Sequence, residues 1–176
     1  MDKVASVRLF LSMVVVRHWP LYQLDIKNAF LHGDLEDEVY MEQPPGFIAQ
    51  GESRGLVCRL RRSLYGLKQS PRAWFGKFST VIQEFGMTRS EADHSVFYRH
   101  SASSLCIYLV VYVDDIVITG NDQDGITNLK QHLFQHFQTK DLGRLKYFLG
   151  IEVAQSSSGI VISQRKYALD ILEETG

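Results

Sequence analysis

Two adjacent aspartates, Asp114 and Asp115, lie within the most apolar stretch of the chain, residues 105–118. Ionised carboxylates resist transfer into an apolar interior, and two neighbouring carboxylates also repel each other. Raised pKa values or bound cations are the usual remedies. The pair therefore fits either the water-exposed tip of a hairpin or part of a divalent-metal site, and the second interpretation needs another carboxylate nearby.

Asp25 is the candidate for that third carboxylate. It lies near the end of a segment, residues 22–26, whose alternation of polar and apolar residues predicts a strand. If this strand lies beside the hairpin, the three aspartates meet at one sheet edge. Three carboxylates can hold two Mg²⁺ ions about 3.5–4 Å apart, the arrangement used for in-line phosphoryl transfer. Because aspartates are also common in turns, spacing alone leaves both interpretations open.

Hydrophobic periodicity predicts the elements that position these residues. Helices are expected over residues 4–16, 71–85 and 124–137, with a short one from Gln164. Strands are expected over residues 22–26, 38–43, 56–60, 96–99, 105–113, 116–119, 146–153 and 160–163, with turns at 44–46, 101–104 and 156–159. This order predicts one α+β domain in which an antiparallel sheet is backed by helices.

Three of these helices carry apolar residues at helical spacing. Pro71 is expected to start one and Gly86 to end it. Its inward side chains would be Trp74, Phe78, Val81, Ile82 and Phe85. The helix at 124–137 would face inward through Ile126, Leu129, Leu133, Phe134 and Phe137. The last helix would do so through Tyr167, Ala168, Ile171 and Leu172.

The charge of the chain is unevenly distributed. The net charge is −1, yet the segment from Ser53 to Gln83 holds no acid. Its basic residues are Arg54, Arg59, Arg61, Arg62, Lys68, Arg72 and Lys77. Acids gather instead at residues 34–38 and toward the C-terminus. This pattern predicts a polyanion-binding face, with a solvated basic loop as the alternative.

Composition and minor motifs bear on three further questions: whether the protein is globular, in which compartment it lies, and whether it binds zinc. The chain has 176 residues, 45% hydrophobic and 22% charged, as in globular domains, and no apolar run approaches the ~20 residues of a membrane span. Cys58 and Cys106 lie in strand-like segments and are expected to be buried thiols of an intracellular protein. His132 and His136 have a zinc-compatible spacing without an evident third ligand, so we expect them on a solvent-exposed face.

Longer motifs resemble a known family. Tyr112-Val113-Asp114-Asp115 is the tetrapeptide of reverse transcriptases. Residues 23–33, 64–74 and 145–153 are similar, in the same order, to segments of Ty1/copia-type retrotransposon polymerases. The resemblance runs from about Ser6 to the C-terminus. It implies a polymerase palm-like antiparallel sheet backed by helices, with part of the fingers, and the activity of an RNA-directed DNA polymerase from an LTR retrotransposon.

The resemblance also implies roles for individual residues. Asp25 and Asp114 would bridge two Mg²⁺ ions, with Mn²⁺ as an alternative, and Asp115 would have a secondary catalytic role. Incoming dNTPs would meet the carbonyl of Ile26, the steric gate Phe30, Tyr65, Gly66 and the proton donor Lys140. Nucleic acid would meet Lys68, Arg72 and the primer-grip residues Phe148, Leu149 and Gly150. The alternatives are a core aromatic for Phe30 and a helix-end cation for Lys140.

The implied partners are an RNA or DNA template with its primer, dNTPs, and the rest of a Pol polyprotein, including integrase and RNase H. Such a protein would act in the cytoplasm, inside a virus-like particle.

The sequence also departs from the family. Members normally carry a basic fingers segment upstream of this start, and thumb and RNase H regions downstream. We therefore expect a domain at 1–176 truncated at both ends, and little activity from the isolated chain. The alternative function is a catalytically inactive remnant that binds nucleic acid weakly. A third function, a metal-dependent nuclease that uses the same carboxylates, is disfavoured. It would need a nearby basic or histidine residue to activate water, and the sequence offers none in a motif context that indicates this role.

Overall fold

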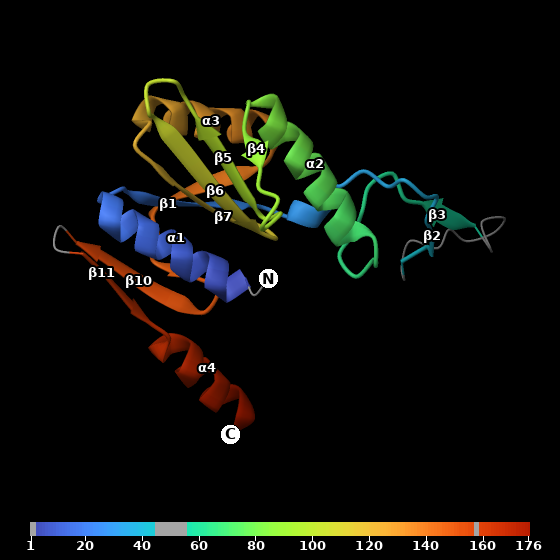
Figure 1. Cartoon of the computed structure of the whole chain (residues 1–176). Helices are drawn as coiled ribbons and strands as arrows, with labels where there is room; N and C mark the ends of the chain where they lie inside the picture. The colour runs from blue at the N-terminus through green and yellow to red at the C-terminus, as the bar shows by residue number, and fades with distance from the viewer. Residues whose placement is uncertain (1–2, 45–55, 157–158) are drawn as a thin grey trace. The chain divides into compact units, whose positions relative to one another are not determined.

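The computed structural model describes residues 3–44, 56–156 and 159–176 (Figure 1). The backbone divides into two units. The first comprises Met1–Lys27 and Val81–Gly176, and the second comprises Asn28–Thr80. Helices and antiparallel strands are mixed along the chain, which confirms the predicted α+β class.

A six-stranded antiparallel sheet with the order β4-β5-β6-β7-β1-β8 forms the centre of the first unit. The strands are β1 (Leu21–Ile26), β4 (Thr88–Arg89), β5 (Val96–His100), β6 (Cys106–Tyr112), β7 (Asp115–Gly120) and β8 (Thr139–Arg144). Strand β1 lies between β7 and β8, so the strand that carries Asp25 is paired on both sides. The predicted adjacency of this strand to the Asp114–Asp115 hairpin is confirmed.

One face of this sheet packs against helix α1 (Lys3–Arg17). Val7, Phe10, Leu11 and Val14, at helical spacing, are buried against Leu21 of β1 and Val110 and Val117 of the hairpin. Because side chains alternate along a strand, Gln23 and Asp25 lie on the same face as Leu21. The carboxylates and helix α1 therefore share one side of the sheet.

Helix α3 (Gln123–His136) covers the opposite face. Its inward residues Ile126, Leu129 and Leu133 are buried, and the Lys130 ammonium lies over the Tyr22 ring, 4.1 Å from its centroid. The Asp122 carboxylate caps the helix by accepting the Gly125 N–H. Phe134, expected to face inward, is 44% exposed, because it follows Leu133 by about 100° around the helix axis.

A separate three-stranded sheet, β11-β10-β9, follows β8 in the chain. The strand expected over residues 146–153 is two strands, β9 (Tyr147–Phe148) and β10 (Ile151–Ser156), joined by a tight turn. Both turn residues have positive φ, 50° at Leu149 and 77° at Gly150, as in a type I′ hairpin. Strand β11 (Gly159–Ser163) pairs with β10, while Ser157 and Ser158 of the predicted turn lie outside the described residues.

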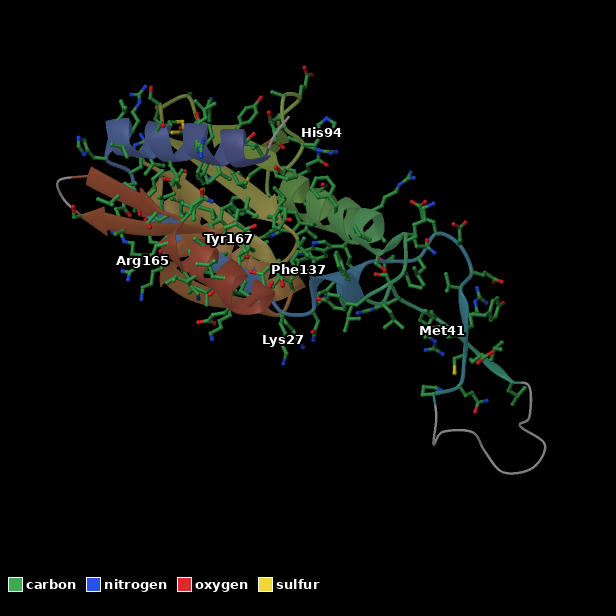
Figure 2. The ribbon with its side chains drawn as sticks, turned by 90° about the horizontal axis from the view of Figure 1, so that it is seen from below. Lys27, Met41, His94, Phe137, Arg165 and Tyr167 are labelled. Atoms are coloured by element: carbon green, nitrogen blue, oxygen red, sulfur yellow. The ribbon has the colours of Figure 1, made fainter. Side chains whose placement is uncertain are left out.

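Helix α4 (Arg165–Thr175) forms where a short helix is predicted, but its packing differs from the prediction. Tyr167, Ile171 and Leu172 are 48%, 41% and 65% exposed, and no residue of the helix is buried. Tyr167 of this helix, labelled in Figure 2, contacts the β9–β10 turn, where its ring lies near Gly150. Periodicity identifies an apolar face, but it does not say whether another element covers that face.

The second unit contains the 3₁₀ helix η1 (Ala29–His32), the ribbon of β2 (Tyr40–Glu42) and β3 (Val57–Arg59), and most of helix α2 (Ser70–Glu84). Trp74 and Phe78 are buried as predicted. Cys58, expected to be buried, is exposed, because it lies in a two-stranded ribbon in which every residue of β2 and β3 is exposed. Pro45 and Gly46 of the predicted turn lie outside the described residues.

Among the residues that the structure describes, no helix is long and apolar enough to cross a membrane.

Gly120 provides a test of how tightly the central hairpin is packed. It ends β7 with φ of 148°, and a Cβ there would collide with the Cys106 carbonyl oxygen. Gly120→Ala should therefore lower the free energy of unfolding by about 2 kcal/mol or more, measured by urea denaturation. The matched control is Gly76→Ala, since a Cβ on this exposed α2 residue meets nothing within 4 Å. That change should stabilise the protein by about 1 kcal/mol, and equal effects of the two changes would contradict the packing.

Candidate active site

The loop between β6 and β7 contains only Val113 and Asp114, because Tyr112 pairs directly with Asp115. Val113 adopts φ of 55°, a conformation that β-branched residues rarely occupy. The N–H of Ile26 donates to the carbonyl oxygen of Asp114 at 2.8 Å, which ties the turn to the end of β1. Asp114 is thus at the tip, whereas Asp115 is already the first residue of a strand.

Three charged residues form a row across three neighbouring strands. Asp25 of β1 faces Asp115 of β7 on one side and Lys140 of β8 on the other. Side chains of directly opposed residues in antiparallel strands lie on the same face, about 4.5–5.5 Å apart at their Cβ atoms. The sheet therefore brings Asp25, Asp115 and Lys140 together on the α1 face, and the three predicted carboxylates share one edge.

Burial and charge act together on Asp115. Burial raises the pKa of this half-buried carboxyl above its ordinary value, and the negative charges of Asp114 and Asp25 raise it further. A hydrogen bond works in the other direction, since Gln23 Nε2 donates to Asp115 Oδ1 at 3.0 Å. Burial is therefore the main cause of the raised pKa, and the Gln23 hydrogen bond offsets the cost of ionising Asp115 only in part.

This imbalance fits a site for hard divalent cations, which bind carboxylate oxygens. The three aspartates are not a closed cage. Among the described residues, the group of three acidic, histidine or cysteine side chains whose ligand atoms lie within 4.8 Å of one another is Glu84, His132 and His136. The carboxylate oxygens of the three aspartates are therefore spaced more widely than that. Open spacing suits Mg²⁺, which usually uses one or two carboxylates together with water and substrate phosphates. The Ile26 side chain is fully buried, so only its backbone can reach a ligand.

Within the second unit, Phe30 and Tyr65 form an accessible aromatic pair with ring centroids 4.9 Å apart. Phe30 is half-buried, Tyr65 is 53% exposed, and the hydroxyl of Ser63 donates to the Phe30 carbonyl. Gly66 follows with φ of 88° and open space around it. Phe30 is therefore not a fully enclosed core aromatic.

The basic segment is partly neutralised within the same unit. Lys77 pairs with Asp34 at 3.2 Å, and Arg59 pairs with Glu38 at 2.6 Å. Acids of residues 34–38 therefore form ion pairs with part of the basic segment. The sequence alone shows the two groups of charges but not their pairing. Lys68 and Arg72 are exposed and carry no ion pair among the described side chains.

The predicted primer-grip residues form the β9–β10 turn. Phe148 is 2% exposed and packs in the core against α1, so its ring is not available to a ligand. Leu149 and Gly150, at the turn itself, are half-buried. Any contact made here by nucleic acid would therefore use the turn rather than the Phe148 ring.

Comparison with known proteins identifies the family. The family model described as reverse transcriptase (RNA-dependent DNA polymerase) matches residues 1–176. The chain belongs to the reverse transcriptase family. It is 47% identical over 173 residues to the retrovirus-related Pol polyprotein from transposon RE1 of Arabidopsis thaliana, covering 98% of this chain and 12% of that protein. Identity is 40% over 173 residues to the corresponding polyprotein from transposon TNT 1-94 of Nicotiana tabacum, covering 97% of this chain and 13% of that protein.

A more distant relative is the transposon Ty1-DR4 Gag-Pol polyprotein of Saccharomyces cerevisiae, 32% identical over 151 residues, covering 81% of this chain and 9% of that protein. These relatives confirm the resemblance to copia and Ty1-type retrotransposon proteins. The reverse transcriptase chain described here spans about an eighth of the length of the two plant relatives.

Sequence reasoning missed one residue that contacts the candidate carboxylates. Gln23 is 8% exposed and bonds to Asp115 across the β1–β7 pair. A signal was present, because Gln23 precedes Asp25 by two residues and must share its face of the strand. A buried polar side chain at that position implies a polar partner.

The raised pKa of Asp115 predicts a pH dependence of stability in metal-free buffer with EDTA. The folded state binds this proton more tightly than the unfolded state, so the contribution of Asp115 is fully present below its ordinary value of 3.8. It is lost as the pH rises through the raised pKa. Asp115→Asn should therefore gain stability relative to the wild type between about pH 4 and pH 7, as measured by urea denaturation across that range.

Asp141→Asn is a control of opposite sign. Burial acts to raise the pKa of Asp141, but hydrogen bonds from Lys130 Nζ and the Gly143 N–H outweigh it and lower the pKa. The contribution of Asp141 is therefore present above pH 3.8 and is lost as the pH falls through the lowered pKa. This variant should be less stable than the wild type at pH 7, and the difference should shrink in acid. Parallel pH profiles for the two variants would contradict both assignments.

Proposed function

We propose that this chain is the RNA-directed DNA polymerase domain of an LTR retrotransposon Pol polyprotein, adding dNTPs to a primer on an RNA or DNA template. The observation that carries the proposal is the register of Asp25 opposite Asp115, with Asp114 at the adjoining turn. The family and its polyprotein relatives support it. The first unit would be the palm, and the second part of the fingers.

Asp25, Asp114 and Asp115 would hold the metal ions, with the Ile26 carbonyl assisting. Two bound Mg²⁺ ions, or Mn²⁺ in their place, would lower the pKa of the primer 3′-hydroxyl and stabilise charge on the triphosphate. Asp25 and Asp114 would be indispensable, while Asp115, held by Gln23, would have a secondary role. The half-buried, mutually repelling carboxylates support this assignment, since a cation relieves their repulsion.

The remaining residues would bind the substrates. Lys140, directly opposite Asp25, would donate a proton to the pyrophosphate leaving group. Tyr65 and Gly66 would lie along the incoming nucleotide, and the exposed side chains of Lys68 and Arg72 would bind backbone phosphates. The Phe148–Gly150 segment would position the primer end through its turn. In a complete element the domain would work beside integrase and RNase H, in cytoplasmic virus-like particles.

The first test joins metal binding to polymerisation. Mg²⁺ should raise the melting temperature of the wild-type chain, because it binds only the folded carboxylate edge, and Asp114→Asn should abolish that rise. Primer extension on oligo(dT)-primed poly(rA) should give weak incorporation by the wild type, in line with the little activity expected of the isolated chain, and none by Asp114→Asn. The control Asp124→Asn, an acid at the start of α3, should behave as the wild type in both assays.

The two readouts separate the competing functions. A Mg²⁺-dependent stabilisation lost in Asp114→Asn, without incorporation, would favour a remnant that keeps its metal site. The absence of both would overturn the proposal.

A second test concerns sugar selectivity. Phe30→Val should raise the ratio of rNTP to dNTP incorporation by about tenfold or more, because a smaller side chain leaves room for the 2′-hydroxyl. Tyr65→Ala is the matched control, since it removes the ring that packs on Phe30 but keeps Phe30 itself. Comparable loss of selectivity in both variants would mean that the aromatic pair, not the Phe30 ring, sets the discrimination.

A further inference from the structure

Glu84, His132 and His136 form a cluster that the polymerase function does not use. One nitrogen or oxygen from each side chain lies within 4.8 Å of the corresponding atoms of the other two. His132 and His136 are four residues apart on α3, and Glu84 is the last residue of α2. The third ligand that the sequence does not reveal is thus supplied by a helix far away in the chain. His132 is also half-buried rather than solvent-exposed.

Backbone carbonyls fix how the two histidines present their nitrogens. His132 Nε2 lies 2.9 Å from the Val81 carbonyl oxygen, and His136 Nδ1 lies 2.8 Å from the His132 carbonyl oxygen. A carbonyl can only accept, so each of these nitrogens carries the proton. In the neutral rings His132 Nδ1 and His136 Nε2 are then lone-pair donors. Such hydrogen bonds from the second nitrogen are the usual support of a metal-binding histidine.

The surroundings favour a cation further. Glu84 and His136 are the final residues of their helices, so the C-terminal ends of α2 and α3 both lie at the cluster. Helix C-termini carry partial negative charge. The His132 ring is also held against Phe85, with centroids 5.4 Å apart. His132 is therefore pre-oriented by its carbonyl and ring contacts, while the exposed Glu84 and His136 can adjust.

We propose that Glu84, His132 and His136 bind a divalent transition-metal ion, with Zn²⁺ as the best match. Two imidazoles and one carboxylate are a zinc ligand set that leaves a fourth position for water, and imidazole disfavours Mg²⁺. The bound ion joins the end of α2 to α3 on the sheet face opposite the aspartates. The site is independent of the polymerase proposal.

The test is a Zn²⁺ titration of the whole chain in competition with a chromogenic chelator. The wild type should bind one equivalent, and Zn²⁺ should raise its melting temperature. His136→Ala should weaken binding by at least about tenfold and remove the thermal shift, since loss of a ligand costs at least as much as loss of an outer-shell partner. Glu84→Gln should also weaken binding. Both side chains are exposed, so the variants should keep the fold, as circular dichroism would check.

Three controls exclude other zinc ligands. His94→Ala removes an exposed histidine outside the cluster, Cys58→Ser removes the exposed thiol, and Asp114→Asn disrupts the carboxylate edge. Each should bind Zn²⁺ as the wild type does. Wild-type affinity in His136→Ala, loss of binding in any control, or no stoichiometric binding by the wild type would overturn the proposal.

Discussion

The rest of this structure must offset the cost of holding partly buried carboxylates close together on one face of an antiparallel sheet. The pairing of β1 with β7 sets Asp25 against Asp115, and the short loop keeps Asp114 beside them. Like charges in opposed positions destabilise a sheet, so apolar packing elsewhere must offset their cost. That packing is present on both sides, from α1 on the carboxylate face and from α3 on the other. The central strands are consequently among the most buried of the described parts of the chain, although charged residues lie at their ends.

The same geometry determines how far neighbouring polar groups offset the negative charge of the carboxylates. Gln23 donates to Asp115, but one neutral amide offsets only part of the negative charge. Lys140 lies on the other side of Asp25, at the edge strand, where its side chain stays exposed. A cationic ligand can therefore complete the charge balance without any rearrangement of the sheet. This charge balance is the physical basis of the proposed phosphoryl-transfer function.

The sequence predicts much of this arrangement, because the helices and the central strands have strong apolar periodicity. It fails where structure depends on a partner rather than on a local pattern. Residues 139–144 are polar apart from Leu142 and Gly143, yet they form β8 because they pair with the edge of β1. Cys58 and the apolar face of α4 are exposed because no described element covers them. Glu84 could not be assigned to the two histidines, since the contact between α2 and α3 is purely tertiary.

The two-residue loop between β6 and β7 has a further consequence. Ile116 and Val117 are buried on opposite faces of the sheet and so fix the face on which Asp115 lies. One extra residue in the loop would therefore leave Asp115 in register but would displace Asp114, whose carbonyl oxygen accepts the Ile26 N–H at the end of β1. All three aspartates would still be encoded, but they would no longer share one sheet edge. The length of this loop is thus as much a requirement of the carboxylate edge as the aspartates themselves.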